Sequence, residues 1–277
     1  MRVQTVLVGT DLTERADQAI VRGHELATAN DAKLIICHVG PGHVGSHPLF
    51  PQRHQEDVVS AASLEELIAE AVSNRTADVT GRDPEQFDVV VDQGDVVAVL
   101  TEQALRVAAD LIVVMDDRPE LDGPRTVARD LARSSSCSIF VVGTGSGTEV
   151  AVVALEDEVE TIPELLSAAG STLGSLPPKA DVILFVDDPT LSISRVSARI
   201  AEQAAQMGIV LVPSFARIGD TSLITRAVEE ASRGLVVMAA PVPDQLTADM
   251  SGPLDDALSA IRSSVLLLRR GTRGAPA

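Results

Sequence analysis

The chain has few aromatic residues and few basic ones. None of its 277 residues is Trp or Tyr and five are Phe, so it lacks the stacking surfaces that bind single-stranded nucleic acids. Lys and Arg number 22 against 40 Asp and Glu, which gives a formal net charge of −18. Basic residues dominate affinity for nucleic-acid phosphates and for anionic membranes. We therefore expect no nucleic-acid partner and no membrane partner.

Long apolar runs and cysteines are also scarce. No stretch of the sequence reaches the roughly 18 apolar residues of a membrane span. The opening MRVQTVLVGTD lacks the length and cleavage signature of a signal peptide. Both cysteines, Cys37 and Cys137, lie in or beside apolar runs, where buried reduced thiols are expected. These features predict a cytoplasmic protein.

The sequence does have short aliphatic runs that alternate with helical spacing. Such alternation predicts right-handed strand–helix–strand units and a parallel sheet, because parallel strands buried on both faces are rich in Val, Ile and Leu. Thr13 is the expected N-cap of the first helix. The first half is predicted to have strands at 3–9, 33–39, 87–91, 110–115 and 137–142, with helices at 13–30, 56–76, 95–109 and 125–135.

The second half repeats landmarks of the first. Gly94-Asp95 and Gly219-Asp220 each open a helical stretch, and we expect each Asp to cap its helix. Later, Leu111–Met115 with Gly123-Pro124 matches Leu235–Met238 with Gly252-Pro253. A repeat of this length is a whole domain. The second half is predicted to have strands at 150–155, 181–186, 209–213, 235–239 and 264–269, with helices at 161–175, 192–207, 220–233 and 252–263.

These patterns predict an α/β chain of two tandem, doubly wound, Rossmann-like domains, each with a five-stranded parallel sheet. The first domain spans 1–143 and the second 150–270, followed by a frayed tail at 271–277. The segment 144–149 is glycine-rich, but it joins a strand to a strand. A dinucleotide fingerprint needs a helix after its glycines, so this segment is predicted to be a linker.

Several motifs, in order, resemble universal stress protein domains. They are the strand VLVGTD of residues 6–11, the helix RADQAIVRGHELA, the strand KLIICHV, Gly94-Asp95 followed by ALRVAADLIVV, and the strand SSSCSIFVV. The resemblance covers 1–143 and, more weakly, 150–269. It implies a tandem universal stress protein with an adenine nucleotide alpha hydrolase-like fold. It also implies that the two domains pair within the chain through 137–142 and 264–269, with a homodimer as a further assembly.

The resemblance implies a site for ATP, which many members bind through Gly-x-x-Gly, nine residues and Gly-Ser/Thr. This chain departs from that signature, since Met115 stands for the first glycine, Arg118 for the second and Arg125-Thr126 for Gly-Ser. The loop also carries Asp116, Asp117, Glu120 and Asp122, which repel phosphates. We expect no cofactor. If a remodelled ATP pocket persists in the first domain, its candidate residues are Gly9, Thr10, Asp11, Val39, Met115, Gly123, Arg125 and Thr126.

Two further groups of residues could carry chemistry. His38, His43, His47 and His54 lie close together in sequence, but their spacing matches no metal signature, so no metal site is predicted. Whether the 43–54 loop binds a metal stays open. Asp116-Asp117 follows a predicted strand, where α/β folds bind ligands, and a solvated acidic loop is the simpler interpretation.

No catalytic motif appears, and the expected function is non-catalytic. We expect a cytoplasmic tandem universal stress protein that acts as a stress-response or regulatory binding protein, with an unidentified protein partner. One alternative is an ATP- or AMP-binding switch that uses the remodelled pocket. A second is a Mg²⁺-dependent phosphate-handling enzyme that uses Asp11, Asp116 and Asp117.

Overall fold

The computed structural model describes residues 3–40, 61–115, 126–143, 149–186, 189–217, 234–240 and 264–269. The chain divides into two compact units, one of residues 2–115 and one that contains residues 116–277. The predicted tail and residues 144–148 of the predicted linker lie outside the described residues.

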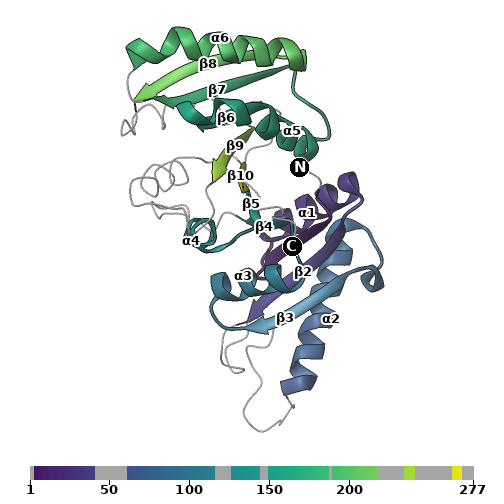
Figure 1. Ribbon diagram of the computed structural model, residues 1–277. Coiled ribbons are helices and arrows are strands. Elements are labelled where there is room, and N and C mark those ends of the chain that lie inside the picture. Colours follow the sequence, from purple (N-terminus) through teal and green to yellow (C-terminus); the bar gives the residue numbers. More distant parts are fainter. Residues whose placement is uncertain are drawn as a thin grey trace, which may run out of the picture. The chain divides into compact units, whose positions relative to one another are not determined.

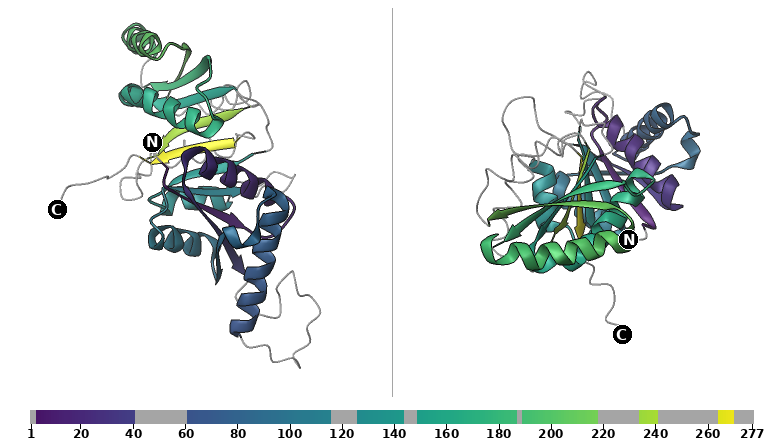
Figure 2. Two further views of the ribbon diagram at one scale, coloured as in Figure 1. Left: turned by 90° about the vertical axis from the view of Figure 1, so that its right-hand side faces the viewer. Right: turned by 90° about the horizontal axis from the view of Figure 1, so that it is seen from above.

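The first unit is a parallel sheet with helices on both faces. Its strands lie in the order β3-β2-β1-β4. Helices α1 and α2 pack together on one face, and α3 lies on the other (Figures 1 and 2). The elements are β1 (Thr5–Thr10), α1 (Asp17–Asn30), β2 (Lys33–Gly40), α2 (Ala61–Thr80), the 3-10 helix η2 (Pro84–Gln86), β3 (Asp88–Gln93), α3 (Val96–Arg106) and β4 (Leu111–Met115).

The second unit has five parallel strands in the order β10-β9-β6-β7-β8, and β5 pairs with β10 antiparallel. Figure 2 shows β10, in yellow, beside β9. The elements are α4 (Thr126–Ser134), β5 (Ser138–Val142), β6 (Val150–Leu155), the 3-10 helix η3 (Glu156–Thr161), α5 (Ile162–Leu173), β7 (Lys179–Val186), α6 (Pro189–Met207), β8 (Val210–Arg217), β9 (Leu235–Ala240) and β10 (Ser264–Arg269).

The described strands repeat one order in the two halves. In sequence order the fourth, first, second and third strands are neighbours in both, as β4-β1-β2-β3 and as β9-β6-β7-β8. The register repeats as well, because Val6 pairs with Leu111 and Val150 pairs with Leu235. The α/β class and the parallel pairing that the sequence predicts are therefore confirmed, and the antiparallel β5–β10 pair makes the pairing mixed.

The core is aliphatic, as the composition predicts. Val6, Leu7 and Val8 of β1 are fully buried, and Phe140 is the largest fully buried side chain among the described residues. Helix α1 approaches β1 closely, since a Cβ on Gly23 would lie 2.3 Å from Val8 Cγ2. Within the described residues, no helix has the length and apolar character needed to cross a membrane.

Among the predicted helix starts of the first half, that of α1 is wrong and that of α3 is confirmed. Helix α1 begins at Asp17 with Ala16 as its N-cap, because Thr13 bonds instead within the preceding turn. The predicted start of α2 at residue 56 lies outside the described residues; the helix is described over Ala61–Thr80 and extends four residues beyond the predicted end. Asp95 caps α3, and its carboxylate accepts a hydrogen bond from the Ala98 N–H at 2.9 Å. Asp220 lies outside the described residues.

Candidate functional site

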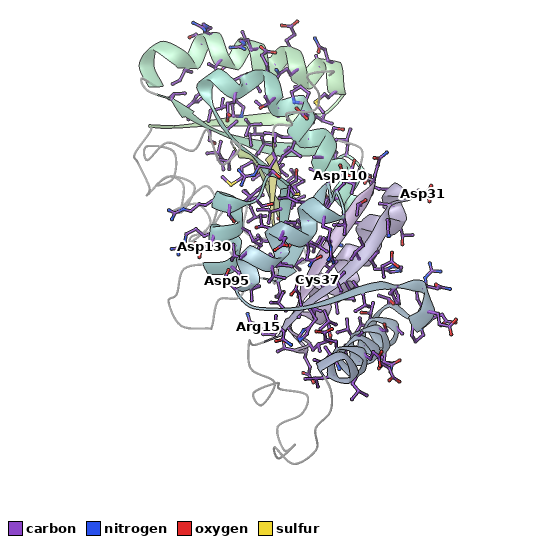
Figure 3. The ribbon with its side chains drawn as sticks, turned by 60° about the horizontal axis from the view of Figure 1, so that its bottom comes forward. Arg15, Asp31, Cys37, Asp95, Asp110 and Asp130 are labelled. Atoms are coloured by element: carbon purple, nitrogen blue, oxygen red, sulfur yellow. The ribbon has the colours of Figure 1, made fainter. Side chains whose placement is uncertain are left out.

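The first unit gathers its predicted ligand residues at the carboxyl ends of its strands. Thr10 pairs with His38, and Val39 pairs with Asp92, so the ends of β1, β2 and β3 lie side by side. Figure 3 shows Arg15 and Asp95 toward this edge, and Asp31 and Asp110 toward the opposite end of the unit. Ligands bind at such edges in doubly wound folds.

Five of the eight predicted pocket residues lie at this edge: Gly9, Thr10, Asp11, Val39 and Met115. Thr126 is the first residue of α4, in the other unit. The remaining candidates lie outside the described residues, namely Gly123, Arg125, Asp116, Asp117, His43, His47 and His54.

The loop after β1 is held by its own side chains. The Asp11 carboxylate accepts hydrogen bonds from the Thr13 N–H at 2.9 Å and from the Thr13 hydroxyl at 2.6 Å. The Thr10 hydroxyl accepts one from the Leu12 N–H at 3.1 Å. Leu12 adopts a φ of 64°, a left-handed conformation that is unfavourable for a residue with a side chain. These bonds offset that strain and occupy the N–H groups of Leu12 and Thr13.

Gly9 supports packing at the same edge. A Cβ on Gly9 would lie 3.0 Å from Leu100 Cδ1 and 3.3 Å from Val114 Cγ1. The space beside the Gly9 backbone is therefore filled by side chains of α3 and β4.

His38 anchors the end of β1 from within the core. It is 2% exposed, and its Nδ1 lies 2.9 Å from the carbonyl oxygen of Thr10. A carbonyl only accepts hydrogen bonds, so Nδ1 carries a proton. Burial lowers the pKa of His38, although the bond to Thr10 and the charge of Asp11 raise it. His38 is therefore a neutral donor to the β1 backbone at pH 7.

Asp92 and Gln103 form a polar pair between β3 and α3 that the sequence analysis missed. Asp92 accepts hydrogen bonds from the Gln93 N–H on Oδ1 and from Gln103 Nε2 on Oδ2, both at 2.8 Å. Gln103 is 2% exposed. The sequence signal that could have found Gln103 is its helical spacing, because this polar residue lies on the same buried face of α3 as Val99 and Leu100.

Cys37 lies near this pair and remains a thiol. Burial is the main cause that raises its pKa to about 12; Asp92 raises it further and Arg106 opposes the change. The predicted burial and reduced state of both cysteines agree with the structure, in which Cys37 and Cys137 are buried and form no disulfide.

At the turn between β3 and α3, a carboxylate of the chain again accepts a hydrogen bond from a backbone N–H group. Gly94 adopts a φ of 133°, which favours glycine, and its N–H bonds the Gly40 carbonyl at 3.3 Å. Asp95 then caps the helix. Thus Asp11, Asp92 and Asp95 each accept a backbone N–H at this edge. No three His, Cys, Asp or Glu side chains are grouped to hold a metal ion in the described part of the chain.

Comparison with known proteins gives a family and a fold. The model of the universal stress protein family matches residues 2–143, a little over half of the chain. A universal stress protein from Archaeoglobus fulgidus has a similar structure, with a TM-score of 0.64, 14% identity and coverage of 98% of this chain and 97% of that one.

Two structures from Pseudomonas aeruginosa are also similar. A putative universal stress protein has a TM-score of 0.62 and 14% identity, with 96% of this chain and 93% of that chain covered. A protein of unknown function has a TM-score of 0.59 and 15% identity, with 96% and 92% covered. No curated protein matches the sequence. At these identities the structures show the fold alone, while the family match covers the motifs of the first half. The chain belongs to the universal stress protein family.

Proposed function

We propose that this universal stress protein works in the cytoplasm as a non-catalytic, stress-response binding protein whose partner is another protein. The observation that supports this proposal is the carboxylate of Asp11, which accepts both the N–H and the hydroxyl of Thr13 at the end of β1. An acidic side chain of the protein itself thus occupies donors that a phosphate group would need.

Phosphate binding requires backbone N–H groups that converge on the ligand, and it is weakened by nearby negative charge. At this edge, Asp11 holds the Thr13 N–H and Asp95 holds the Ala98 N–H. A triphosphate would have to displace these carboxylates and lie among them. This arrangement favours a protein that does not use ATP in its first half.

The second half fills the corresponding position with its own chain. After β6 the chain enters η3, where Val159 is fully buried. The buried Gln203 of α6 donates a hydrogen bond to the Val159 carbonyl at 3.0 Å. The chain that directly follows β6 is thus packed and hydrogen-bonded to α6, which disfavours nucleotide binding there too.

An ATP- or AMP-binding switch is the second candidate. It is favoured by the convergence of Gly9, Asp11, Val39 and Met115 on one edge. In this case nucleotide binding would release Thr13 from Asp11.

Calorimetric titration of the full chain with Mg-ATP and with AMP separates the two candidates. We expect no saturable heat up to about millimolar nucleotide, which corresponds to less than about 4 kcal/mol of binding free energy. Asp11→Asn and Thr13→Val serve as a matched pair, because each removes part of the same contact. Micromolar binding by the parent chain would establish the switch instead. Phosphate release from Mg-ATP above the background rate would contradict a non-catalytic function.

A further inference from the structure

The edge strands β3, in the first unit, and β8, in the second, are accessible to solvent. Each stands at an end of the strand order, and within the described residues no strand pairs with its outer side (Figure 1). None of the described residues of either strand is buried, whereas β5 and β10 are buried throughout. The outward N–H and C=O groups of an edge strand can pair with another chain.

Two contacts identify the backbone groups of β3 that face outward. The Gly94 N–H donates to the last carbonyl of β2 at 3.3 Å, so Gly94 faces β2. The Gln93 N–H donates instead to the side chain of its neighbour Asp92 at 2.8 Å, so it is not part of that ladder. Successive N–H groups of an extended chain point to opposite sides of the strand. The N–H and C=O groups of Val89 and Val91 therefore point away from β2.

A proline protects the equivalent edge of β8. The Val210 N–H donates to the Pro178 carbonyl, just before β7, at 3.0 Å, so Val210 faces β7. Pro213, three residues later, then faces outward, and it has no N–H to donate. The sequence of β3 is DVVVDQ and contains no proline. Of these two edges, that of β3 keeps its donors and can accept another strand.

The edge of β3 is also strongly acidic. From residue 83 to residue 95 the chain has no Lys or Arg and five acidic residues, namely Asp83, Glu85, Asp88, Asp92 and Asp95. Asp88 and Asp92 lie on β3 itself, four residues apart and so on the same face. Lys33 of the neighbouring strand β2 pairs with Asp88 at 2.6 Å, yet the Asp88 side chain remains 59% exposed. A basic side chain on the outer side of β3 can make the same kind of cross-strand contact.

We propose that the edge of β3 binds an extended segment of a partner protein as a further strand, and that Lys or Arg alternates with β-branched residues in this segment. The backbone groups of Val89 and Val91 bond the segment, and its basic side chains lie beside Asp88 and Asp92. Its β-branched side chains lie on the other face. The proposal rests on the proposed function, because it names the class of the protein partner.

A second copy of the chain fits this edge less well. It would bring the acidic residues around one β3 close to those of the other, and each chain has a net charge of −18. Like charges on paired strands are destabilising, whereas opposite charges are stabilising. The charge of the edge therefore selects a basic segment.

The test uses the full, ¹⁵N-labelled chain and the peptide acetyl-Gly-Lys-Val-Lys-Val-Lys-Gly-amide. Amide hydrogen exchange is followed by NMR without the peptide and with the peptide at about ten times its Kd. We expect exchange at Val89 and Val91 to slow by about tenfold, because the peptide bonds their N–H groups. Exchange at Val90, whose N–H already faces β2, should slow less. Equal slowing at all three residues, or no binding up to about millimolar peptide, would overturn the proposal.

Two altered peptides separate strand addition from attraction by charge. A peptide with every Lys and Val nitrogen methylated keeps the charge but cannot donate to a strand, and we expect about tenfold weaker binding. A peptide with Glu in place of each Lys keeps the backbone and should also bind about tenfold more weakly. Undiminished binding by the methylated peptide would mean attraction by charge alone, and undiminished binding by the acidic peptide would mean that charge does not select the partner. Either result contradicts the proposal.

A variant locates the binding edge. Val91→Pro gives β3 the protection that Pro213 gives β8, and it should abolish binding. Val91→Thr is the matched control, because it keeps the N–H and a β-branched side chain. The outward amides of Leu211 and Phe215 on β8 are the internal control and should not slow. If Val91→Pro melts like the parent and still binds, the site is not at β3; if it does not fold, the methylated peptide with the parent chain decides.

The remaining outcomes are distinct from those of the ATP titration. Exchange at Val89 and Val91 that is slow in the chain alone and becomes faster on dilution would identify a second copy as the occupant and overturn the proposal. Failure of the peptide to bind would leave the non-catalytic function untouched. Micromolar ATP binding would refute the proposed function without changing the exchange pattern expected at β3.

Discussion

Ser138 and Ser264 make reciprocal hydrogen bonds at the two ends of one strand pair. The Ser138 hydroxyl accepts the Arg269 N–H at 3.1 Å, and the Ser264 hydroxyl accepts the Gly143 N–H at 3.2 Å. Each serine is the first residue of its strand, β5 or β10, and Phe140 pairs with Leu266 at the centre. Because these strands hold equivalent positions in the two sequence repeats, their contact has approximate two-fold symmetry.

The two serine contacts should contribute equally to stability. Both hydroxyls are buried, and we expect Ser138→Ala and Ser264→Ala each to lower the free energy of unfolding by about 1 kcal/mol. Urea denaturation measures both variants against the parent. Ser134→Ala is a control, because Ser134 is exposed and its hydroxyl donates to the Asp130 carbonyl of its own helix. A large loss in one variant and none in the other would show that the symmetry is geometric and not energetic.

Arg269 breaks this symmetry, since Gly143 stands at the equivalent place. The Arg269 guanidinium is buried and donates to the Ala132 carbonyl, in the last turn of α4, where a cation is favourable. Burial lowers its pKa to about 10. We expect Arg269→Met to lower the free energy of unfolding by about 1–3 kcal/mol, because it leaves buried acceptors unpaired.

Arg269→Lys tests geometry separately from charge. A lysine keeps the positive charge but lacks the planar fork, so an intermediate loss is expected. The variants are compared by urea denaturation. A more stable Arg269→Met would mean that desolvation of the guanidinium outweighs its hydrogen bonds.

The sequence predicted the elements whose cause is local. Aliphatic runs located the strands of the first half, and the Gly-Asp pair located the start of α3, because glycine permits the φ of 133° and Asp95 caps the next turn. The start of α1 was misplaced because the Thr13 hydroxyl accepts the Ala16 N–H and donates to Asp11 within a turn that precedes the helix. The Asp92–Gln103 pair could not be predicted, since it depends on how α3 is rotated against β3.

The residue before the fourth strand makes different contacts in the two repeats, namely side-chain hydrogen bonds at Asp110 and close backbone packing at Gly234. Asp110 accepts the N–H groups of Gln4 and Thr5 at 2.7 Å and 3.1 Å. At the corresponding place, a Cβ on Gly234 would lie 1.9 Å from the Glu149 carbonyl oxygen. We expect Asp110→Ala to lower the free energy of unfolding by about 1–3 kcal/mol through lost hydrogen bonds.

Gly234→Ala should be the more damaging change, because the backbone of β9 must move away from Glu149. We expect a loss of about 2 kcal/mol or more, outside the range of ordinary surface substitutions. Thermal melts of Gly234→Ala and Gly174→Ala provide the comparison, since Gly174 has no atom within 4 Å of its would-be Cβ but has a φ of 81°. Gly234 does not adopt a left-handed φ, so equal losses would mean that its close approach to Glu149 costs no more than the backbone strain at Gly174.

His38 should make the protein less stable as the pH falls below 6.5, its ordinary pKa. Burial lowers the pKa of His38 in the folded chain, so the unfolded chain binds a proton first as the pH falls. Above pH 6.5 His38 is neutral in both the folded and the unfolded chain, so it adds no pH dependence to the free energy of unfolding. His24 also has a pKa lowered by burial and by Arg82, so it too makes the protein less stable as the pH falls.

Urea denaturation at pH 7, 6 and 5 should show a smaller loss of stability in His38→Asn than in the parent. His24→Asn is the matched control and should recover less, because His38 is 2% exposed and His24 is half-buried. An unchanged pH dependence in His38→Asn would assign the effect to other groups.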